Sequence, residues 1–200
     1  MSTPIDFYFD FSSPYGYFAS LHIEKLAAQH AREVQWHPIL LGPIFKLMNI
    51  APLANIPLKG AYSMHDIVRT ARFHNMLLTM PEVFPISSQV AARAVLWTQE
   101  NAPEKAVSFI HTLYSAYFTE NINISNADVV LRIAADLGID QQALATALND
   151  DAIKAVLKTA IETAISRGVF GSPFVIADGE AFWGFDRFEQ LNTFLKEGKI

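Results

Sequence analysis

The chain has 200 residues, of which 51% are hydrophobic, and a formal net charge of -5. A chain of this length can bury a sizeable core as one domain, or as a core domain that carries an insertion. The acidic balance offers no basic face for phosphates, so nucleic acid is not expected as a partner. No apolar run approaches the roughly 20 residues of a membrane span, and no secretion signal is recognisable, so we expect a cytoplasmic protein without membrane contact.

The chain contains no cysteine. This excludes disulfides, thiolate nucleophiles and thiolate-bound metals. The six histidines show no paired-ligand helical motif such as H-E-x-x-H and lie in no acidic cluster, so no metal site is expected. Any sulfur chemistry must therefore come from a ligand.

The amino-terminal part predicts a strand, a helix and a second strand. The segment "IDFYFDF" at 5–11 alternates with the period of a strand. A helical stripe runs from Tyr15 to Ala27, with Pro14 suited to the first turn. The segment "EVQWHPI" at 33–39 is typical of a short strand. A crossover of this kind makes the two strands parallel neighbours.

The middle of the chain predicts helices. Residues 41–60 are irregular and rich in proline, which predicts a short helix around 44–48 and then a flexible loop. Residues 62–167 carry helical periodicity with several breaks, which predicts a block of antiparallel helices. Four aromatic residues at helical spacings in this block are expected in the core: Phe109, Tyr114, Tyr117 and Phe118.

The carboxyl end returns to strands. The segment "SPFVIADGEAFWGF" predicts a hairpin with its turn at 178–179. The final helix is predicted to begin with Asp186 as N-cap and Glu189 as capping-box partner. This order indicates an α/β protein with a thioredoxin-like fold and an inserted all-helical domain. We predict a thioredoxin-like domain from residues 1–60 and 168–200, and a helical insertion domain from residues 61–167.

Ser13 stands where the first strand ends and the first helix begins, a place that favours negative charge. Its simplest role is the N-cap before Pro14. A hydrolase nucleophile is disfavoured, because "FSSPY" lacks the G-x-S-x-G elbow and no histidine and acid are placed to activate the serine. A hydroxyl at a helix start can instead donate a hydrogen bond to a ligand's thiolate.

Three further positions have two interpretations each. In "GSPF", Pro173 makes either an ordinary trans turn or a cis bond that would turn the backbone of Ser172 outward. Asp186 is an N-cap or a partner for a ligand's ammonium group. Lys59, in the same predicted loop as Asn49, is solvated or contacts a ligand.

Five segments, in order, resemble the DsbA-like thioredoxin superfamily: "FYFDFSSPYGYF", "PILLGPIFKLMNIAPLANIPLKG", "FPISS", "GVFGSPFVI" and "WGFDRFEQL". Within it, the chain is most similar to the 2-hydroxychromene-2-carboxylate isomerases and the kappa-class glutathione transferases. The resemblance covers nearly the whole chain. It implies a homodimer that binds glutathione and isomerises 2-hydroxychromene-2-carboxylate or a related aromatic-degradation intermediate. A kappa-like transferase that conjugates electrophiles is one alternative, and a non-redox DsbA-like peptide-binding protein is another.

The resemblance also implies roles for single residues. Ser13 matches the family's catalytic serine, which stands before a proline and contacts the glutathione sulfur. Ser172 matches the residue before the family's cis-proline, whose backbone pairs with the cysteinyl part of glutathione. Asn49 and Lys59 match loop positions of the kappa enzymes, with Lys59 meeting the glycyl carboxylate.

The family's γ-glutamyl site matches four consecutive residues: Trp183, Gly184, Phe185 and Asp186. Phe185 is apolar where the relatives usually carry a polar residue, so a side-chain contact is lost there. In "FPISS", Ser87 or Ser88 takes a position at which an Asn is often found.

This resemblance gives the missing cysteines a chemical explanation. The glutathione thiol has an ordinary pKa of about 8.5, and only its thiolate is a good nucleophile. A hydrogen bond from Ser13 and the field of the helix start would stabilise the thiolate by about 1.5–3 kcal/mol, or roughly one to two pKa units. In the isomerase mechanism the thiolate adds reversibly to the opened, conjugated substrate and leaves after bond rotation.

Overall fold

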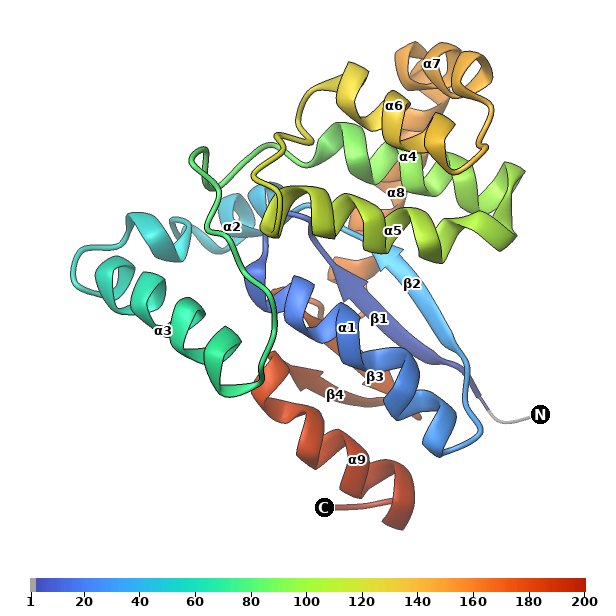
Figure 1. Ribbon diagram of the computed structural model, residues 1–200. Coiled ribbons are helices and arrows are strands. Elements are labelled where there is room, and N and C mark those ends of the chain that lie inside the picture. The colour runs from blue at the N-terminus through green and yellow to red at the C-terminus, as the bar shows by residue number, and fades with distance from the viewer. Residues whose placement is uncertain (1–2) are drawn as a thin grey trace.

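A computed structural model describes residues 3–200, so the first two residues of the predicted 1–60 segment lie outside the described residues. Its four-stranded sheet has the order β2-β1-β3-β4 (Figure 1). β1 pairs in parallel with β2 and antiparallel with β3, and β3 forms a hairpin with β4. Both the parallel pair and the hairpin confirm the predictions. The strands are β1 (Ile5–Phe9), β2 (Val34–Pro38), β3 (Phe174–Ala177) and β4 (Glu180–Trp183).

Both faces of the sheet are covered. On one face, Phe7 and Phe9 belong to the main core together with residues of α1 (Pro14–Gln29). On the other face, Tyr8 belongs to a second cluster that includes Ala164 of α8 (Asp151–Ser166). Figure 1 shows α1 crossing in front of the sheet and α8 behind it. The alternation in "IDFYFDF" therefore marks two buried faces, and Tyr8 is only 3% exposed.

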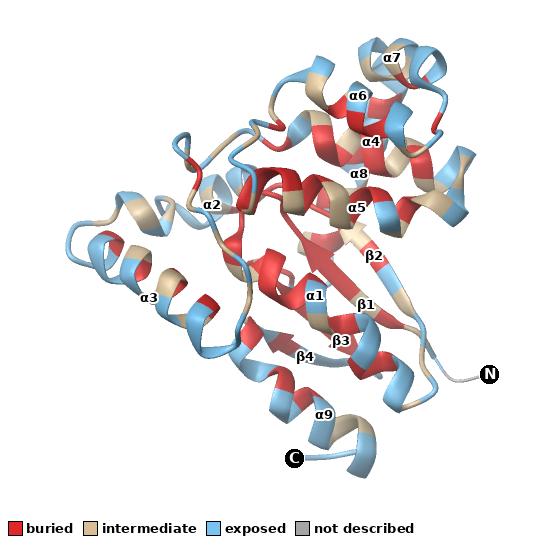
Figure 2. Ribbon diagram, viewed as in Figure 1, coloured by how far each residue is buried: buried red, intermediate tan, exposed pale blue. Residues whose placement is uncertain are grey.

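Every regular element between β2 and β3 is a helix. Figure 2 shows that these helices turn buried sides inward and exposed sides outward. This agrees with the predicted helical insertion, although the predicted boundary after residue 60 falls within α3. The α-helices are α2 (Leu41–Met48), α3 (Lys59–Phe73), α4 (Gln89–Asn101), α5 (Pro103–Phe118), α6 (Ala127–Asp136), α7 (Gln141–Asn149) and α8 (Asp151–Ser166), with a 3-10 turn η1 (Leu53–Asn55).

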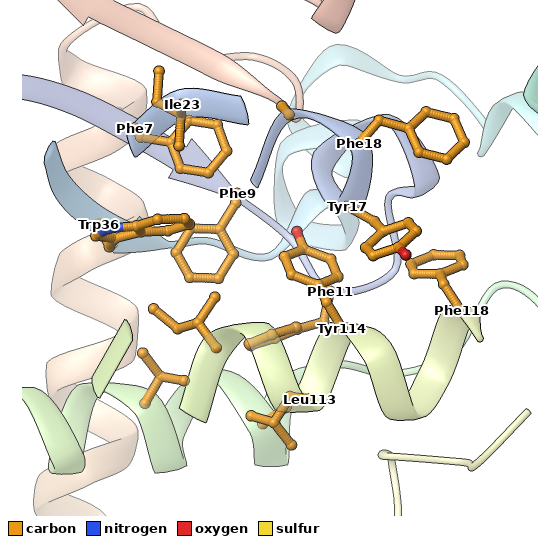
Figure 3. Packing of buried hydrophobic residues seen from close by; sticks show 14 of the residues in the cluster. Phe7, Phe9, Phe11, Tyr17, Phe18, Ile23, Trp36, Leu113, Tyr114 and Phe118 are labelled. Atoms are coloured by element: carbon orange, nitrogen blue, oxygen red, sulfur yellow. The ribbon is translucent and has the colours of Figure 1, made fainter. Parts of the chain in front are cut away.

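Aromatic side chains join α5 to the sheet and to α1 (Figure 3). The Tyr114 ring lies 4.8 Å from the ring of Phe11, and the Phe118 ring stacks at 5.3 Å on that of Tyr17. All four aromatic residues predicted as core in this block are at most 1% exposed. The prediction that they are core residues is confirmed.

Two local predictions were wrong. The final helix, α9 (Phe188–Glu197), begins two residues after Asp186, which lies instead in a 3-10 turn η2 (Phe185–Arg187) and caps no helix. The cause is Gly184, whose φ of 106° sets up that tight turn before the α-helix begins. Asn49 and Lys59 do not share one flexible loop: Asn49 ends α2 and Lys59 begins α3.

Within the described residues, no helix is long and apolar enough to cross a membrane. The same part of the chain contains no group of three or more His, Asp or Glu side chains placed to hold a metal ion.

Candidate active site

Ser13 joins the end of β1 to the start of α1 and is 5% exposed. Its backbone is extended, and its hydroxyl oxygen accepts a hydrogen bond from the Gly16 N–H over 3.0 Å, which confirms it as the N-cap. Pro14 stands in the first turn, where no amide donor is needed. The buried Ser13 hydroxyl therefore lies at the amino end of α1, which is the positive end of the helix dipole.

The Ser13 hydroxyl also acts as a donor. It donates to the carbonyl oxygen of Ser172 over 2.8 Å. The peptide bond between Ser172 and Pro173 is cis, so of the two alternatives in "GSPF" the structure has the cis one. The Gly16 N–H occupies a lone pair of the Ser13 oxygen, which leaves the hydroxyl proton free to point away from the helix. Two segments from opposite ends of the chain therefore meet at Ser13.

Gly16 is required by this packing. A Cβ at this position would lie 2.8 Å from both the Ser172 hydroxyl oxygen and the Tyr114 hydroxyl oxygen, closer than real contacts allow. The absence of a side chain at Gly16 thus lets α1, α5 and the turn at Ser172 come together around Ser13.

Asp10 lies beneath this junction and is 3% exposed. One carboxylate oxygen accepts from the Ser12 N–H at 2.8 Å and from the Ser88 hydroxyl at 2.6 Å, and the other accepts from the Leu41 N–H at 2.7 Å. Burial raises the pKa of Asp10, and these hydrogen bonds oppose the rise. Asp10 was not predicted as a site residue, because its only signal in the sequence is a charged residue at the end of a strand that is buried on both faces.

Trp183 and Gly184 lie beside the turn at Ser172 and Pro173. The Gly184 N–H donates to the Pro173 carbonyl oxygen over 3.0 Å. A Cβ on Gly171 would lie 2.2 Å from the Trp183 indole nitrogen, so the indole packs directly over that glycine. Trp183 is nonetheless 56% exposed and offers an aromatic surface next to Ser172.

Phe185 and Asp186 point in different directions. Phe185 is 7% exposed and packs against the rings of His22 and His74, at 5.1 and 4.9 Å. The Asp186 side chain is 72% exposed, and its carboxylate lies 3.3 Å from the guanidinium of Arg187. Only the backbone of Phe185 can therefore face a ligand, whereas the Asp186 carboxylate is accessible.

Asn49 and Lys59 lie further along the chain, at the ends of α2 and α3. Asn49 adopts a left-handed backbone with a φ of 55° and closes α2. Both residues are exposed, and neither side chain has a hydrogen-bond partner among the described residues. The start of α2 is tied to the site through the bond from Leu41 to Asp10, but in the described part of the chain no hydrogen bond joins Asn49 or Lys59 to Ser13.

Comparison with known proteins agrees with this geometry. The family model of the DSBA-like thioredoxin domain matches residues 4–196. A 2-hydroxychromene-2-carboxylate isomerase of Sphingobium xenophagum is 30% identical over 198 residues, which cover 98% of this chain and 99% of that protein. This chain belongs to the 2-hydroxychromene-2-carboxylate isomerase and kappa glutathione transferase family of DSBA-like thioredoxin domains.

Other members of the family extend the likeness. A solved structure of 2-hydroxychromene-2-carboxylate isomerase matches this DSBA-like chain with a TM-score of 0.86 and 25% identity, and covers 97% of this chain and 95% of that one. A glutathione S-transferase kappa 1 of Caenorhabditis elegans is 24% identical over 96% of this chain and 91% of its own length. The named relatives are thus isomerases and transferases, which identifies an enzyme family.

Proposed function

We propose that this protein is a glutathione-dependent cis–trans isomerase of 2-hydroxychromene-2-carboxylate or a related aromatic-degradation intermediate. The observation that carries the proposal is the Ser13 hydroxyl, a buried donor at the start of α1 in a chain without cysteine. The isomerase of Sphingobium xenophagum is 30% identical to this chain and the kappa transferase of Caenorhabditis elegans is 24% identical, which supports isomerisation over conjugation.

The residues at the site fit glutathione. The Ser172 N–H has no hydrogen-bond partner among the described residues and is available to pair with the cysteinyl carbonyl. Lys59, which has no ion-pair partner within residues 3–200, is a cation for the glycyl carboxylate, with Asn49 ten positions before it in the sequence. At the other end, the γ-glutamyl group would meet Trp183, Gly184, the backbone of Phe185 and the exposed carboxylate of Asp186.

Bound glutathione would supply a thiolate that adds reversibly to a conjugated substrate. Ser13 has to release the Ser172 carbonyl in order to donate to that sulfur. A bond to a neutral acceptor is thus exchanged for a stronger charge-assisted bond. Together with the field of the helix start, this exchange would stabilise the glutathione thiolate by about 1.5 kcal/mol, or roughly one pKa unit. This is the lower end of the range expected from the sequence.

The exchange also frees an acceptor. Once Ser13 turns to the sulfur, the Ser172 carbonyl can accept from the cysteinyl N–H of glutathione, next to the free Ser172 N–H. The two strand-like hydrogen bonds would then hold the cysteinyl residue with its sulfur above the start of α1.

The test is an absorbance assay with 2-hydroxychromene-2-carboxylate, with and without glutathione, in which free thiol is followed in the same sample. We expect isomerisation only when glutathione is present and no loss of thiol. Isomerisation without glutathione, or no turnover in either sample, would refute the proposal. Consumption of thiol with an aryl halide, without isomerisation, would instead assign the transferase activity that the kappa-named relatives carry.

A further inference from the structure

Ser88 stands at the start of α4 but does not cap it. A serine at this position ordinarily accepts a hydrogen bond from the first turn of its helix, which stabilises the helix. The Ser88 hydroxyl makes no such bond and donates instead to a carboxylate oxygen of Asp10, 2.6 Å away. Both residues are at most 4% exposed. Side-chain capping of α4 is thus absent, and the hydroxyl is used in a buried bond between the helical segment and β1.

Asp10 makes hydrogen bonds to the turn that presents Ser13 and to Ser172. Its carboxylate holds the Ser12 N–H, and its carbonyl oxygen accepts from the Ser13 N–H over 2.9 Å, so the turn that presents Ser13 closes on Asp10. Its own N–H donates to the Ser172 hydroxyl oxygen over 2.9 Å. Asp10 therefore bonds to both serines of the site but presents no free oxygen toward the exterior.

The same residue is tied to the helical segment twice. The Tyr114 hydroxyl of α5 donates to the Asp10 carbonyl oxygen over 3.0 Å, and the Ser88 hydroxyl donates to the carboxylate. Two of the three donors to that carboxylate, at Ser12 and Leu41, are backbone N–H groups that cannot act as acceptors. The carboxylate is consequently fixed on both oxygens, and Ser88 is the side chain of the helical segment that fixes it.

We propose that Asp10 and Ser88 form a positioning pair, through which the helical segment sets the direction in which Ser13 donates its hydroxyl proton. Neither residue touches the substrate or glutathione, and both act through the turn from Asp10 to Ser13. This role rests on the proposed function, because the direction of the Ser13 proton matters only if it has a sulfur to meet. Loss of the Ser88 hydroxyl removes the hydrogen bond that ties the carboxylate to α4, so the carboxylate is then held by its bonds to Ser12 and Leu41 and can shift toward them.

The test compares Ser88→Ala with Asn126→Ala. Asn126 caps α6 through a real capping bond to the Asp128 N–H at 2.9 Å, so its removal destabilises a helix of the same segment away from Asp10. We expect Ser88→Ala to lower kcat by about three- to tenfold, with the KM for glutathione unchanged within about twofold. Asn126→Ala should lower the melting temperature and leave kcat unchanged.

A second measurement does not depend on the reaction. In amide NMR spectra, the Ser13 and Gly16 signals should move in Ser88→Ala and stay in place in Asn126→Ala. Equal kcat in the two variants, or unmoved Ser13 and Gly16 signals in Ser88→Ala, would overturn the positioning role. Absence of turnover in the unaltered protein would refute the proposed function, and the amide signals would then decide on the pair alone.

Discussion

The Ser13 hydroxyl donates to the Ser172 carbonyl oxygen over 2.8 Å, although the two residues are 159 positions apart in the chain. This bond joins the start of α1 to the turn that enters the hairpin. It also leaves the Ser13 proton committed to a neutral acceptor until a stronger one arrives. Under the proposed function, the reactive state of the site would therefore depend on a change of hydrogen-bond partner by the Ser13 hydroxyl.

Ser13→Ala should lower turnover about ten- to a hundredfold, with values near ten favoured by the exchange of partners. The fold should persist, because loss of an N-cap lowers the free energy of unfolding by about 1 kcal/mol. Steady-state kinetics and urea unfolding measure the two effects separately. Ser125→Ala is the control, since its hydroxyl donates to the Asn123 side-chain oxygen over 2.7 Å in an exposed turn before α6. Turnover of Ser13→Ala equal to that control would leave Ser13 as a cap only.

The order of elements and the main core were predictable from the sequence, because periodicity reports which side chains an element buries. The surroundings of Asp10 were not predictable in this way. Its partners at Leu41, Ser88, Tyr114 and Ser172 come from four distant segments, and no local pattern brings them together. Its burial depends on helices that cover both sheet faces.

The start of the last helix was mispredicted for a local reason. A capping box is a pattern of residue types, and Asp186 with Glu189 satisfies it. The positive φ of Gly184 commits the chain to a 3-10 turn first, so the Asp186 carboxylate stays in solvent. In the sequence, the only indication of such a backbone angle is the glycine itself, and glycine also occurs in many other backbone conformations.

Gly16→Ala should destabilise the protein by about 1–3 kcal/mol, because the added methyl would overlap the Ser172 and Tyr114 hydroxyl oxygens. Gly42→Ala is the matched control, since it also lies in the first turn of a helix and a Cβ there would meet nothing within 4 Å. That control should be neutral or stabilising by up to about 1 kcal/mol. Chemical unfolding measures the stability of both variants. Equal denaturant midpoints for Gly16→Ala and Gly42→Ala would contradict the close packing around Ser13.

Asp6 is expected to make stability depend on pH. Burial alone would raise its pKa, but hydrogen bonds from Arg167 and His37 outweigh that effect and hold the pKa of Asp6 below its usual value. A carboxyl group with a lowered folded-state pKa stabilises the fold above its ordinary pKa of about 3.9 and loses this contribution as the pH falls further.

Asp6→Asn should therefore lower the free energy of unfolding at neutral pH by about 1 kcal/mol, a value limited by the partial exposure of the Arg167 side chain. The difference from the unaltered protein should shrink to nearly nothing as the pH falls through the lowered pKa. Urea unfolding at a series of pH values measures it. Asp151→Asn, in a surface pair with Lys154, should change stability little at any pH. A constant effect of Asp6→Asn across this range would show that its charge is not involved.

Glutathione should raise the melting temperature of the protein, because a ligand that binds only the folded state stabilises it by mass action. At a concentration of about a hundred times the Kd, the stabilisation is about 2.7 kcal/mol. Thermal unfolding monitored by circular dichroism measures the shift, and ophthalmic acid, which carries a methyl group in place of the thiol, reports how much of it comes from the sulfur. No shift at millimolar glutathione would remove glutathione from the proposed reaction.

Lys59→Met should weaken glutathione binding about fivefold, because an exposed ion pair with the glycyl carboxylate contributes about 1 kcal/mol. The contact would lie at the start of α3, where Lys59 has no competing partner among the described residues. Lys46→Met, in α2, is the control for loss of one positive charge nearby, and calorimetric titration compares the two Kd values. Because the contact is exposed, added salt should weaken binding to the unaltered protein and affect Lys59→Met less. Equal Kd values for the two variants would place the glycyl carboxylate elsewhere.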